Sequence, residues 1–197
     1  MGITIAYFII AIYSLALLLI FFYSLSQLNL LLNYLGFKRR NKEAPKFNLL
    51  DPKEIPYVTI QLPIYNEEYV VERLLENIAR IEYPKSKLEI QVLDDSTDDS
   101  VEQTAAMIED LQKQGLDIQH IRRENREGFK AGALKEGLKI AKGDFIAIFD
   151  ADFLPDADWL KKTVIYFKDE EIGVVQTRWG HINRDYSTLT KIQAFAL

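Results

Sequence analysis

The chain has 197 residues, of which 48% are hydrophobic and 27% are charged, and its formal net charge is −5. This length suits one domain or two at most, and the mild acidic balance argues against a nucleic-acid-binding protein that relies on charge. The chain has no cysteine and only two histidines, which excludes a disulfide scaffold, a thiol nucleophile, a thiolate zinc site and a metal site of three histidines.

The first 37 residues contain no Asp, Glu, Lys, Arg or His, and the segment 3–22 is almost wholly apolar. About 20 residues of α-helix span roughly 30 Å, the thickness of a membrane hydrocarbon core. A secretory signal would have a basic start, a shorter apolar run and small residues at a cleavage site. A buried core helix that is apolar on all sides would need a larger protein around it. We therefore expect residues 1–37 to form an uncleaved transmembrane anchor.

A basic stretch follows this anchor, with five lysines and arginines between residues 38 and 46. Such residues are enriched on the cytoplasmic side of membrane helices, so we expect the following domain to be cytoplasmic. We interpret 38–55 as a basic linker. The predicted location is a membrane, either the plasma or inner membrane or one of the Golgi type.

From about residue 56 the sequence alternates between strand and helix patterns. Runs rich in β-branched and apolar residues predict strands at 57–62, 88–93, 117–121, 144–149 and 172–176. Apolar residues at helical spacing predict helices between the strands, the first of them capped by Asn66, and a further helix over 157–168. This alternation is typical of an α/β fold with a mostly parallel sheet, and we assign 56–197 to that one domain.

Acidic residues follow three of these strands. Glu67 and Glu68 come after the first strand, Asp94 and Asp95 after the second, and Asp150 and Asp152 after the fourth. Ligands of parallel sheets bind at the carboxyl ends of the strands, so these side chains should converge there. Two carboxylates 4 Å apart repel by about 4 kcal/mol at an intermediate dielectric, and a divalent cation relieves this repulsion. The pair at 150 and 152 therefore suggests a metal-bound diphosphate.

Two common phosphate-binding motifs do not fit. The first strand runs into PIYNEE instead of the G-x-G-x-x-G turn of dinucleotide-binding proteins, and 128–132 lacks the Lys-Ser/Thr of a P-loop. Lys130 nevertheless opens a predicted helix, where backbone N–H groups and the helix dipole favour a phosphate. The alternative for Lys130 is a solvated surface lysine.

Four segments carry a resemblance when taken together and in order. They are PIYNEE after the first strand, LDDSTDDS after the second, GFKAGALKEG at the third helix and FIAIFDADFLP at the fourth strand. This set resembles the family-2 glycosyltransferases, which have a GT-A fold. The continuation VVQTRWGHINRDYS is similar to the glucomannan-synthase and cellulose-synthase-like branch. The resemblance covers about 57–197.

The resemblance implies inverting transfer of a sugar from a UDP- or GDP-linked donor to a growing polysaccharide, with Mg²⁺ or Mn²⁺ as cofactor. By position, Tyr65 and Glu67 would line the nucleoside pocket, and Asp95 rather than Asp94 would contact the base. The implied donor-binding residues are Pro63, Tyr65, Glu67, Asp95, Lys130 and Asp150. The implied metal ligands are Asp150 and Asp152, and the implied acceptor-side residues are Gln176, Arg178 and Trp179.

Two family motifs are missing from this sequence. The acidic motif that supplies the general base, often Thr-Glu-Asp, does not follow residue 179, and no Gln-x-x-Arg-Trp motif occurs at the family's spacing. We therefore expect an N-terminal fragment that binds donor but is inactive alone. The alternatives are a single-sugar transferase with a lipid acceptor, a non-catalytic nucleotide-sugar-binding membrane module, and an anchored α/β protein whose acids only cap helices.

Overall fold

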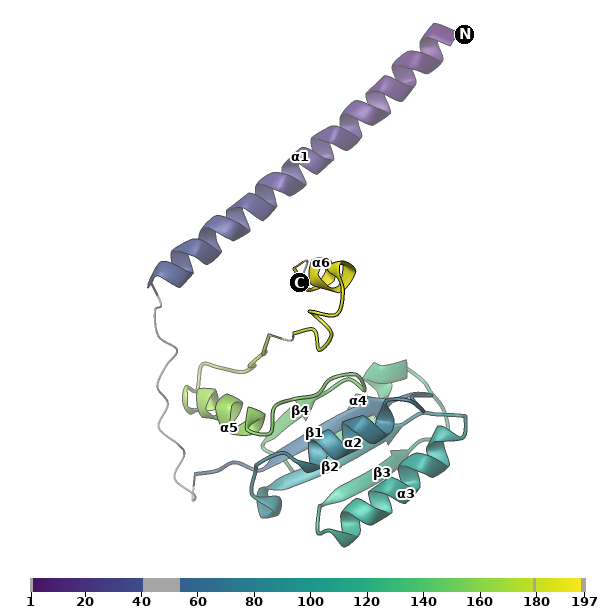
Figure 1. Ribbon diagram of the computed structural model, residues 1–197, viewed down its shortest axis with the longest axis vertical. Helices are drawn as coiled ribbons and strands as arrows, with labels where there is room; N and C mark the ends of the chain where they lie inside the picture. Colours follow the sequence, from purple (N-terminus) through teal and green to yellow (C-terminus); the bar gives the residue numbers. More distant parts are fainter. Residues whose placement is uncertain (1, 41–53, 179, 196–197) are drawn as a thin grey trace. The chain divides into compact units, whose positions relative to one another are not determined.

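The computed structural model describes residues 2–40, 54–178 and 180–195 (Figure 1). The chain divides into two compact units, Met1–Phe47 and Asn48–Leu197. Most of the predicted linker 38–55 lies outside the described residues.

The described part of the first unit is one helix, α1 (Gly2–Arg40). Its segment Ile3–Phe37 is long and apolar enough to cross a membrane, and its side chains are almost all exposed. The helix continues for three residues beyond the predicted end of the anchor at residue 37. An exposed surface of this size and character is a membrane-span candidate, because water is a poor solvent for it.

The second unit is built on a parallel sheet. Within the described residues the sheet has four strands in the order β3-β2-β1-β4, and every pairing is parallel. The strands are β1 (Val58–Ile64), β2 (Leu88–Asp94), β3 (Ile118–Arg122) and β4 (Phe145–Ile148). This confirms the predicted α/β class.

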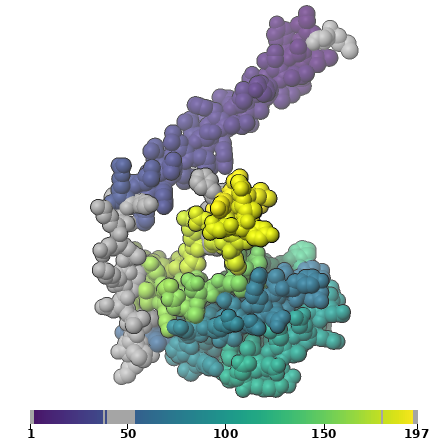
Figure 2. Space-filling model, in the orientation of Figure 1, coloured from purple at the N-terminus to yellow at the C-terminus, as the bar shows by residue number. Residues whose placement is uncertain are grey.

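Helices cover both faces of this sheet. They are α2 (Val71–Ala79), α3 (Ser100–Lys113), α4 (Phe129–Leu138) and α5 (Trp159–Val164), with α6 (Thr188–Phe195) later in the chain. Two 3₁₀ turns, η1 (Lys85–Lys87) and η2 (Ile165–Lys168), complete the described elements. Figure 1 shows α2 and α3 in front of the sheet and α4 behind it, and Figure 2 shows the side chains of α2 and α3 covering that near face. Right-handed crossovers on a sheet whose order reverses at β1 require this division.

The core lies between the sheet and α2 and α3. Ile60, Leu62, Ile90 and Val92 of the two central strands are almost completely buried, as is Leu74 of α2. Strands buried on both faces read as nearly continuous apolar runs, which is why 57–62 and 88–93 were recognisable.

Helix α4 lies very close to the opposite face of the sheet. A Cβ atom added at Gly137 would come within 2.6 Å of Gln61 Nε2 and 2.7 Å of Gln91 Oε1. These two buried glutamines bond to each other, with Gln61 Nε2 donating to Gln91 Oε1 over 3.0 Å. The close approach fixes where the first turn of α4 and Lys130 stand relative to the carboxyl ends of β1 and β2.

Strand β1 includes Pro63, although we predicted from the sequence that the strand ends at residue 62. The backbone N–H and C=O positions of residues 61 and 63 are on the side of β1 toward β4. This follows because Phe149 donates its backbone N–H to the carbonyl of Gln61 over 3.2 Å. The paired residues of β1 and β4 end at Gln61 and Ile148, whereas β1 and β2 pair as far as Ile64. Pro63 therefore lacks an N–H only where no strand of the sheet requires one.

The predicted strand at 172–176 is wrong. This segment has irregular backbone, and Val174 is 83% exposed. A strand needs a neighbour for its backbone N–H and C=O groups, and none of the described strands pairs with it. The predicted helix over 157–168 is present as α5 followed by η2.

Candidate functional site

The loops that follow β1 and β2 are tied together by Asn66. The backbone N–H of Asn66 donates to Ser96 Oγ over 2.9 Å, and the N–H of Thr97 donates to Asn66 Oδ1 over 2.9 Å. Asn66 has a left-handed backbone (φ 55°), which asparagine tolerates better than most residues. The prediction that Asn66 caps the first helix is wrong, because α2 begins at Val71 and Asn66 bonds across the sheet edge instead.

Asp94 supports the second of these loops from inside the protein. It is buried, accepts the N–H of Ser96 over 2.8 Å, and lies 2.7 Å from His120 Nε2 on β3. Burial alone would raise the pKa of Asp94, but the hydrogen bonds from His120 and Ser96 outweigh it and hold that pKa below its usual value. Asp94 is therefore occupied within the protein, which leaves Asp95 as the acid that faces the cavity described below.

We expect replacement of Asp94 by Asn to make the free energy of unfolding less dependent on pH in the acidic range. A carboxyl group whose pKa is lowered on folding stabilises the protein above its unfolded pKa of about 3.9, and this contribution disappears as the pH falls through the folded pKa. The free energy of unfolding of the wild type should therefore exceed that of Asp94→Asn by about 1–3 kcal/mol at pH 5, and the difference should be smaller at pH 3. Chemical unfolding at both pH values measures the difference, and a gap that does not change with pH would contradict the account.

Asp95 is held by a guanidinium group from the loop after β3. Arg123 Nε donates to Asp95 Oδ1 over 2.7 Å, and Arg123 Nη2 donates to Asp95 Oδ2 over 2.6 Å. The Asp95 side chain is only 6% exposed. Hydrogen bonding to Asp95 is the main reason that the pKa of Arg123 is raised above its ordinary value.

Tyr65 has a cation against its ring. The guanidinium carbon of Arg126 lies 3.2 Å from the centroid of the Tyr65 ring and 5.3 Å from that of Phe129, and Arg126 Nε lies 3.6 Å from Asp95 Oδ2. This is a cation–π contact at stacking distance. Arg126 thus covers one face of the Tyr65 ring, and Tyr65 as a whole is 39% exposed.

Lys130 and Asp150 form an ion pair between the first turn of α4 and the end of β4. Asp150 and Asp152 are two positions apart after β4, and both line the same cavity, as their spacing predicts. Lys130 Nζ and the N-terminal backbone of α4 add positive charge next to these two carboxylates. Anionic and cationic groups thus meet at the carboxyl edge of the sheet.

A cavity of about 460 Å³ opens at this edge, between the ends of β1, β2 and β4 and the start of α4. Its volume is in the range of small-molecule sites. It is lined by Pro63, Ile64, Tyr65, Glu67, Leu93, Asp95, Arg126, Lys130, Ala133, Asp150, Ala151 and Asp152. The structure therefore brings together every residue predicted for donor and metal binding.

The carboxylates of the cavity suit a divalent cation that also binds a ligand. In the described part of the chain, no group of three His, Cys, Asp or Glu side chains could hold a metal by itself. Asp150 and Asp152 supply two hard oxygen donors, and Mg²⁺ typically takes one or two carboxylates and completes its shell with water and phosphate oxygens. The residues fit a cation that shares its coordination with a diphosphate.

The residues predicted for the acceptor side are not part of this cavity. Gln176 and Arg178 are exposed on the irregular segment after η2, and neither lines it. Trp179 lies outside the described residues. Their predicted role has no support from the described geometry.

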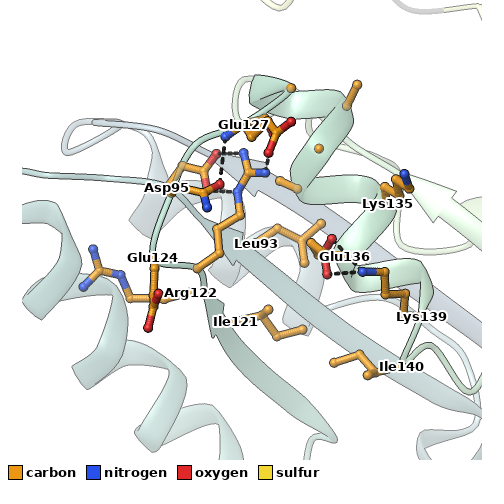
Figure 3. A pocket seen from close by; sticks show the side chains of 16 residues that line it. Leu93, Asp95, Ile121, Arg122, Glu124, Glu127, Lys135, Glu136, Lys139 and Ile140 are labelled. Carbon is orange, nitrogen blue, oxygen red and sulfur yellow. Dashed lines mark hydrogen bonds and ion pairs between the residues drawn. The ribbon is translucent and has the colours of Figure 1, made fainter.

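A larger cavity of about 720 Å³ lies next to the first, between β3 and α4 (Figure 3). Its large apolar side chains are Leu93, Ile121 and Ile140, and it shares Leu93, Asp95 and Ala133 with the smaller cavity. Figure 3 shows Asp95 and Glu127 near one another at one end and Glu136 bonded to Lys139 at the other. None of the residues predicted for phosphate or metal lines it.

A comparison with sequence families identifies the group. The family described as "Glycosyl transferase family 2" matches residues 59–195, which is well over half of the chain. The chain belongs to this family. The resemblance drawn from the four sequence segments is confirmed at the family level.

Similar plant proteins indicate the branch of family 2 to which this chain belongs. Glucomannan 4-beta-mannosyltransferase 1 of Cyamopsis tetragonoloba is 38% identical over 168 residues, which is 82% of this chain and 32% of that protein. Probable glucomannan 4-beta-mannosyltransferase 4 of Oryza sativa subsp. japonica is 40% identical over 147 residues, or 72% of this chain and 27% of that protein. They support the glucomannan-synthase, cellulose-synthase-like branch. The chain spans about a third of the length of these curated relatives.

Solved structures agree with the GT-A fold of family 2. The mannosyltransferase PcManGT from Pyrobaculum calidifontis, in complex with GDP-Man and Mn²⁺, is 33% identical with a TM-score of 0.60, covering 79% of this chain and 44% of that one. S. aureus TarS is 23% identical with a TM-score of 0.51, covering 63% of this chain and 23% of that one, and this likeness concerns the fold alone.

Three contacts of the site were not anticipated from the sequence. Arg123 binds Asp95, Arg126 stacks on Tyr65, and His120 bonds to buried Asp94. All three residues belong to β3 or the loop that follows it, a strand end at which the sequence analysis found no acid. The rule that ligands bind at the carboxyl ends of parallel strands applies to this loop as well.

Proposed function

We propose that the chain is the donor-binding part of a membrane-anchored, inverting glycosyltransferase that moves a sugar from a nucleotide-diphosphate sugar to a growing polysaccharide. The observation that carries this proposal is the meeting of Tyr65, Asp95, Lys130, Asp150 and Asp152 in one cavity. The likeness to glucomannan mannosyltransferases and to an enzyme bound to GDP-Man and Mn²⁺ favours GDP-mannose as donor over a UDP sugar.

Each residue has a role that follows from its chemistry. The ring of Tyr65 would stack against the base, and the carboxylate of Asp95 would accept N–H groups of the base. Lys130 and the N-terminus of α4 would bind the diphosphate. Asp150 and Asp152 would hold Mg²⁺ or Mn²⁺, which, when bound, supplies positive charge against the leaving diphosphate.

Lys130 and Asp150 would change partners when donor binds. In the structure the ammonium group of Lys130 contacts Asp150 directly. Because Lys130 and a cation compete for Asp150, a cation there would leave the lysine available for phosphate oxygens. The ion pair holds both charged groups at the cavity until the donor arrives.

An inverting transfer also needs a base within hydrogen-bond reach of the acceptor hydroxyl, and such a base contributes about 10²- to 10⁴-fold. In this proposal the donor and the cation already use the carboxylates of the cavity. We therefore expect the residues of this chain to bind the sugar nucleotide without transferring its sugar. The apolar helix α1 would anchor the enzyme, with the basic residues after it on the cytoplasmic side.

Calorimetry on the detergent-solubilised chain tests this function. GDP-mannose should bind in the presence of Mn²⁺ and lose at least about 10-fold in affinity when the metal is removed by EDTA, since the diphosphate then meets the Asp152 carboxylate without a cation while Lys130 stays paired with Asp150. UDP-glucose should bind more weakly than GDP-mannose. Binding of equal strength with and without metal would contradict the metal assignment, and the absence of any nucleotide binding would contradict the function.

A further inference from the structure

Arg123 contacts both Asp95, the proposed ligand of the base, and the turn that precedes Lys130, the proposed ligand of the diphosphate. Besides its two bonds to Asp95, its Nη1 donates to the carbonyl of Glu127 over 2.7 Å and its Nη2 donates to the carbonyl of Phe129 over 2.7 Å. The Arg123 side chain is only 15% exposed. It lines the larger cavity and not the donor cavity, so it would act on a donor through other residues.

The paired bonds fix the orientation of the Asp95 carboxylate. A guanidinium group binds a carboxylate through two parallel N–H donors, which restricts rotation as well as position. Each carboxylate oxygen has about two lone-pair sites, so both oxygens keep acceptor capacity after Arg123 has bound. Asp95 also lines the donor cavity, where that capacity is available to a ligand.

The carbonyl contacts of Arg123 hold an unusual turn at the start of α4. Gly128 and Phe129 both have left-handed backbones, with φ of 70° and 48°, and a left-handed conformation is costly for phenylalanine. The carbonyl of Phe129 accepts a bond from Arg123, and Lys130 is the next residue. One side chain thus links the acid next to Tyr65 with the turn that carries Lys130.

We propose that Arg123 is the positioning residue that makes the donor site select bases with an imino N–H, which are guanine and uracil, over adenine and cytosine. This inference rests on the proposed function. Guanine and uracil present an N–H donor on the ring edge where adenine and cytosine present a nitrogen lone pair. A carboxylate is an acceptor only, so it attracts the first pair and repels the second. That discrimination requires the carboxylate to be held in one orientation.

The test compares nucleotides that differ in the base edge but not in ring size. Dissociation constants of GDP, ADP, UDP and CDP, each with Mn²⁺, give two ratios, ADP to GDP and CDP to UDP. For the wild type we expect both ratios to be about 10 to 100, the value of a hydrogen bond to a charged group. In Arg123→Gln both ratios should fall below about 3. Any weakening of the four nucleotides through Lys130, caused by loss of the bonds to the Glu127 and Phe129 carbonyls, cancels in the ratios because the nucleotides share the same diphosphate.

Two further variants control the comparison. Arg73→Gln removes the same charge from an exposed position on α2 and should keep the wild-type ratios. Arg123→Lys retains a cation but not the paired donors, so its ratios should lie between those of the wild type and Arg123→Gln. It also provides the measurement if Arg123→Gln does not fold.

The outcomes are distinct. Unchanged ratios in Arg123→Gln and Arg123→Lys would overturn the proposal. Equal weakening of all nucleotides and pyrophosphate, together with a lower melting temperature, would also overturn it, because that result indicates a purely structural role for Arg123. A wild type that binds pyrophosphate and nucleotides without regard to the base overturns the proposal for Arg123 but leaves the diphosphate site intact. A wild type that binds none of them overturns the proposed function itself.

Discussion

Replacement of Asp152 by Ala is expected to weaken the binding of GDP-mannose by about 100-fold or more when Mn²⁺ is present. Changes to groups that merely support metal ligands already reduce metal affinity by about 10- to 100-fold, so the loss of a direct ligand should cost at least as much. Asp152 is exposed after β4 and has no structural bond among the contacts described. The variant should therefore fold normally, and without metal it should bind GDP-mannose at least as tightly as the wild type does without metal, because one carboxylate that repels the diphosphate is gone.

Calorimetry with and without EDTA measures this effect, and Glu170→Ala is the matched control. Glu170 is another exposed acid, on the turn after η2, and it does not line the donor cavity. The control should bind GDP-mannose as the wild type does. If Asp152→Ala kept its metal-dependent affinity, Asp152 would not be a metal ligand, and the role of the acids after β4 would have to be reconsidered.

Replacement of Gly132 by Ala should cause a large loss of stability and of donor affinity. A Cβ at this position would stand 1.9 Å from the backbone oxygen of Glu127 and 2.5 Å from Arg123 Nη1, which is the contact that holds the turn before α4. Overpacking of this kind costs about 1–3 kcal/mol, which exceeds the 0.5–1 kcal/mol that alanine otherwise gains over glycine inside a helix. Because the clash is with a backbone atom, we place the cost at the upper end of this range, which leaves a net loss of about 2 kcal/mol and a fall in melting temperature of about 5 °C.

Thermal unfolding followed by nucleotide titration checks this prediction. Gly173→Ala is the control, because a Cβ at Gly173 would meet no atom within 4 Å and should leave the melting temperature within about 1–2 °C of the wild type. An alanine at 132 that raised the melting temperature would show that the Arg123 contact with Glu127 is not needed to hold the start of α4.

Much of this fold could be predicted from the sequence because its signals are local. The buried central strands read as apolar runs, and the acids stand directly after them. Since parallel strands bring their carboxyl ends to one edge, Asp95, Asp150 and Asp152 could be placed in one cavity without a structure. Their positions directly after predicted strands were sufficient for this, because the parallel sheet brings those positions together.

The missed features depend on contacts between distant residues. Nothing local distinguishes Arg123 and Arg126 from solvated loop residues, because their roles follow from Asp95 and Tyr65 on other elements. Asn66 has the residue type of a helix cap, but the bond to Thr97 across the sheet edge holds it elsewhere. The segment 172–176 has strand composition, and composition alone does not provide a neighbouring strand.

Crystallography of the chain with GDP-mannose and Mn²⁺, using the anomalous signal of manganese, tests the central claim most directly. The account predicts a manganese peak within coordination distance of Asp150 and Asp152, with the diphosphate next to Lys130 and guanine against Tyr65 and Asp95. Manganese bound away from Asp150 and Asp152, or a nucleotide seated in the larger cavity between β3 and α4, would contradict it.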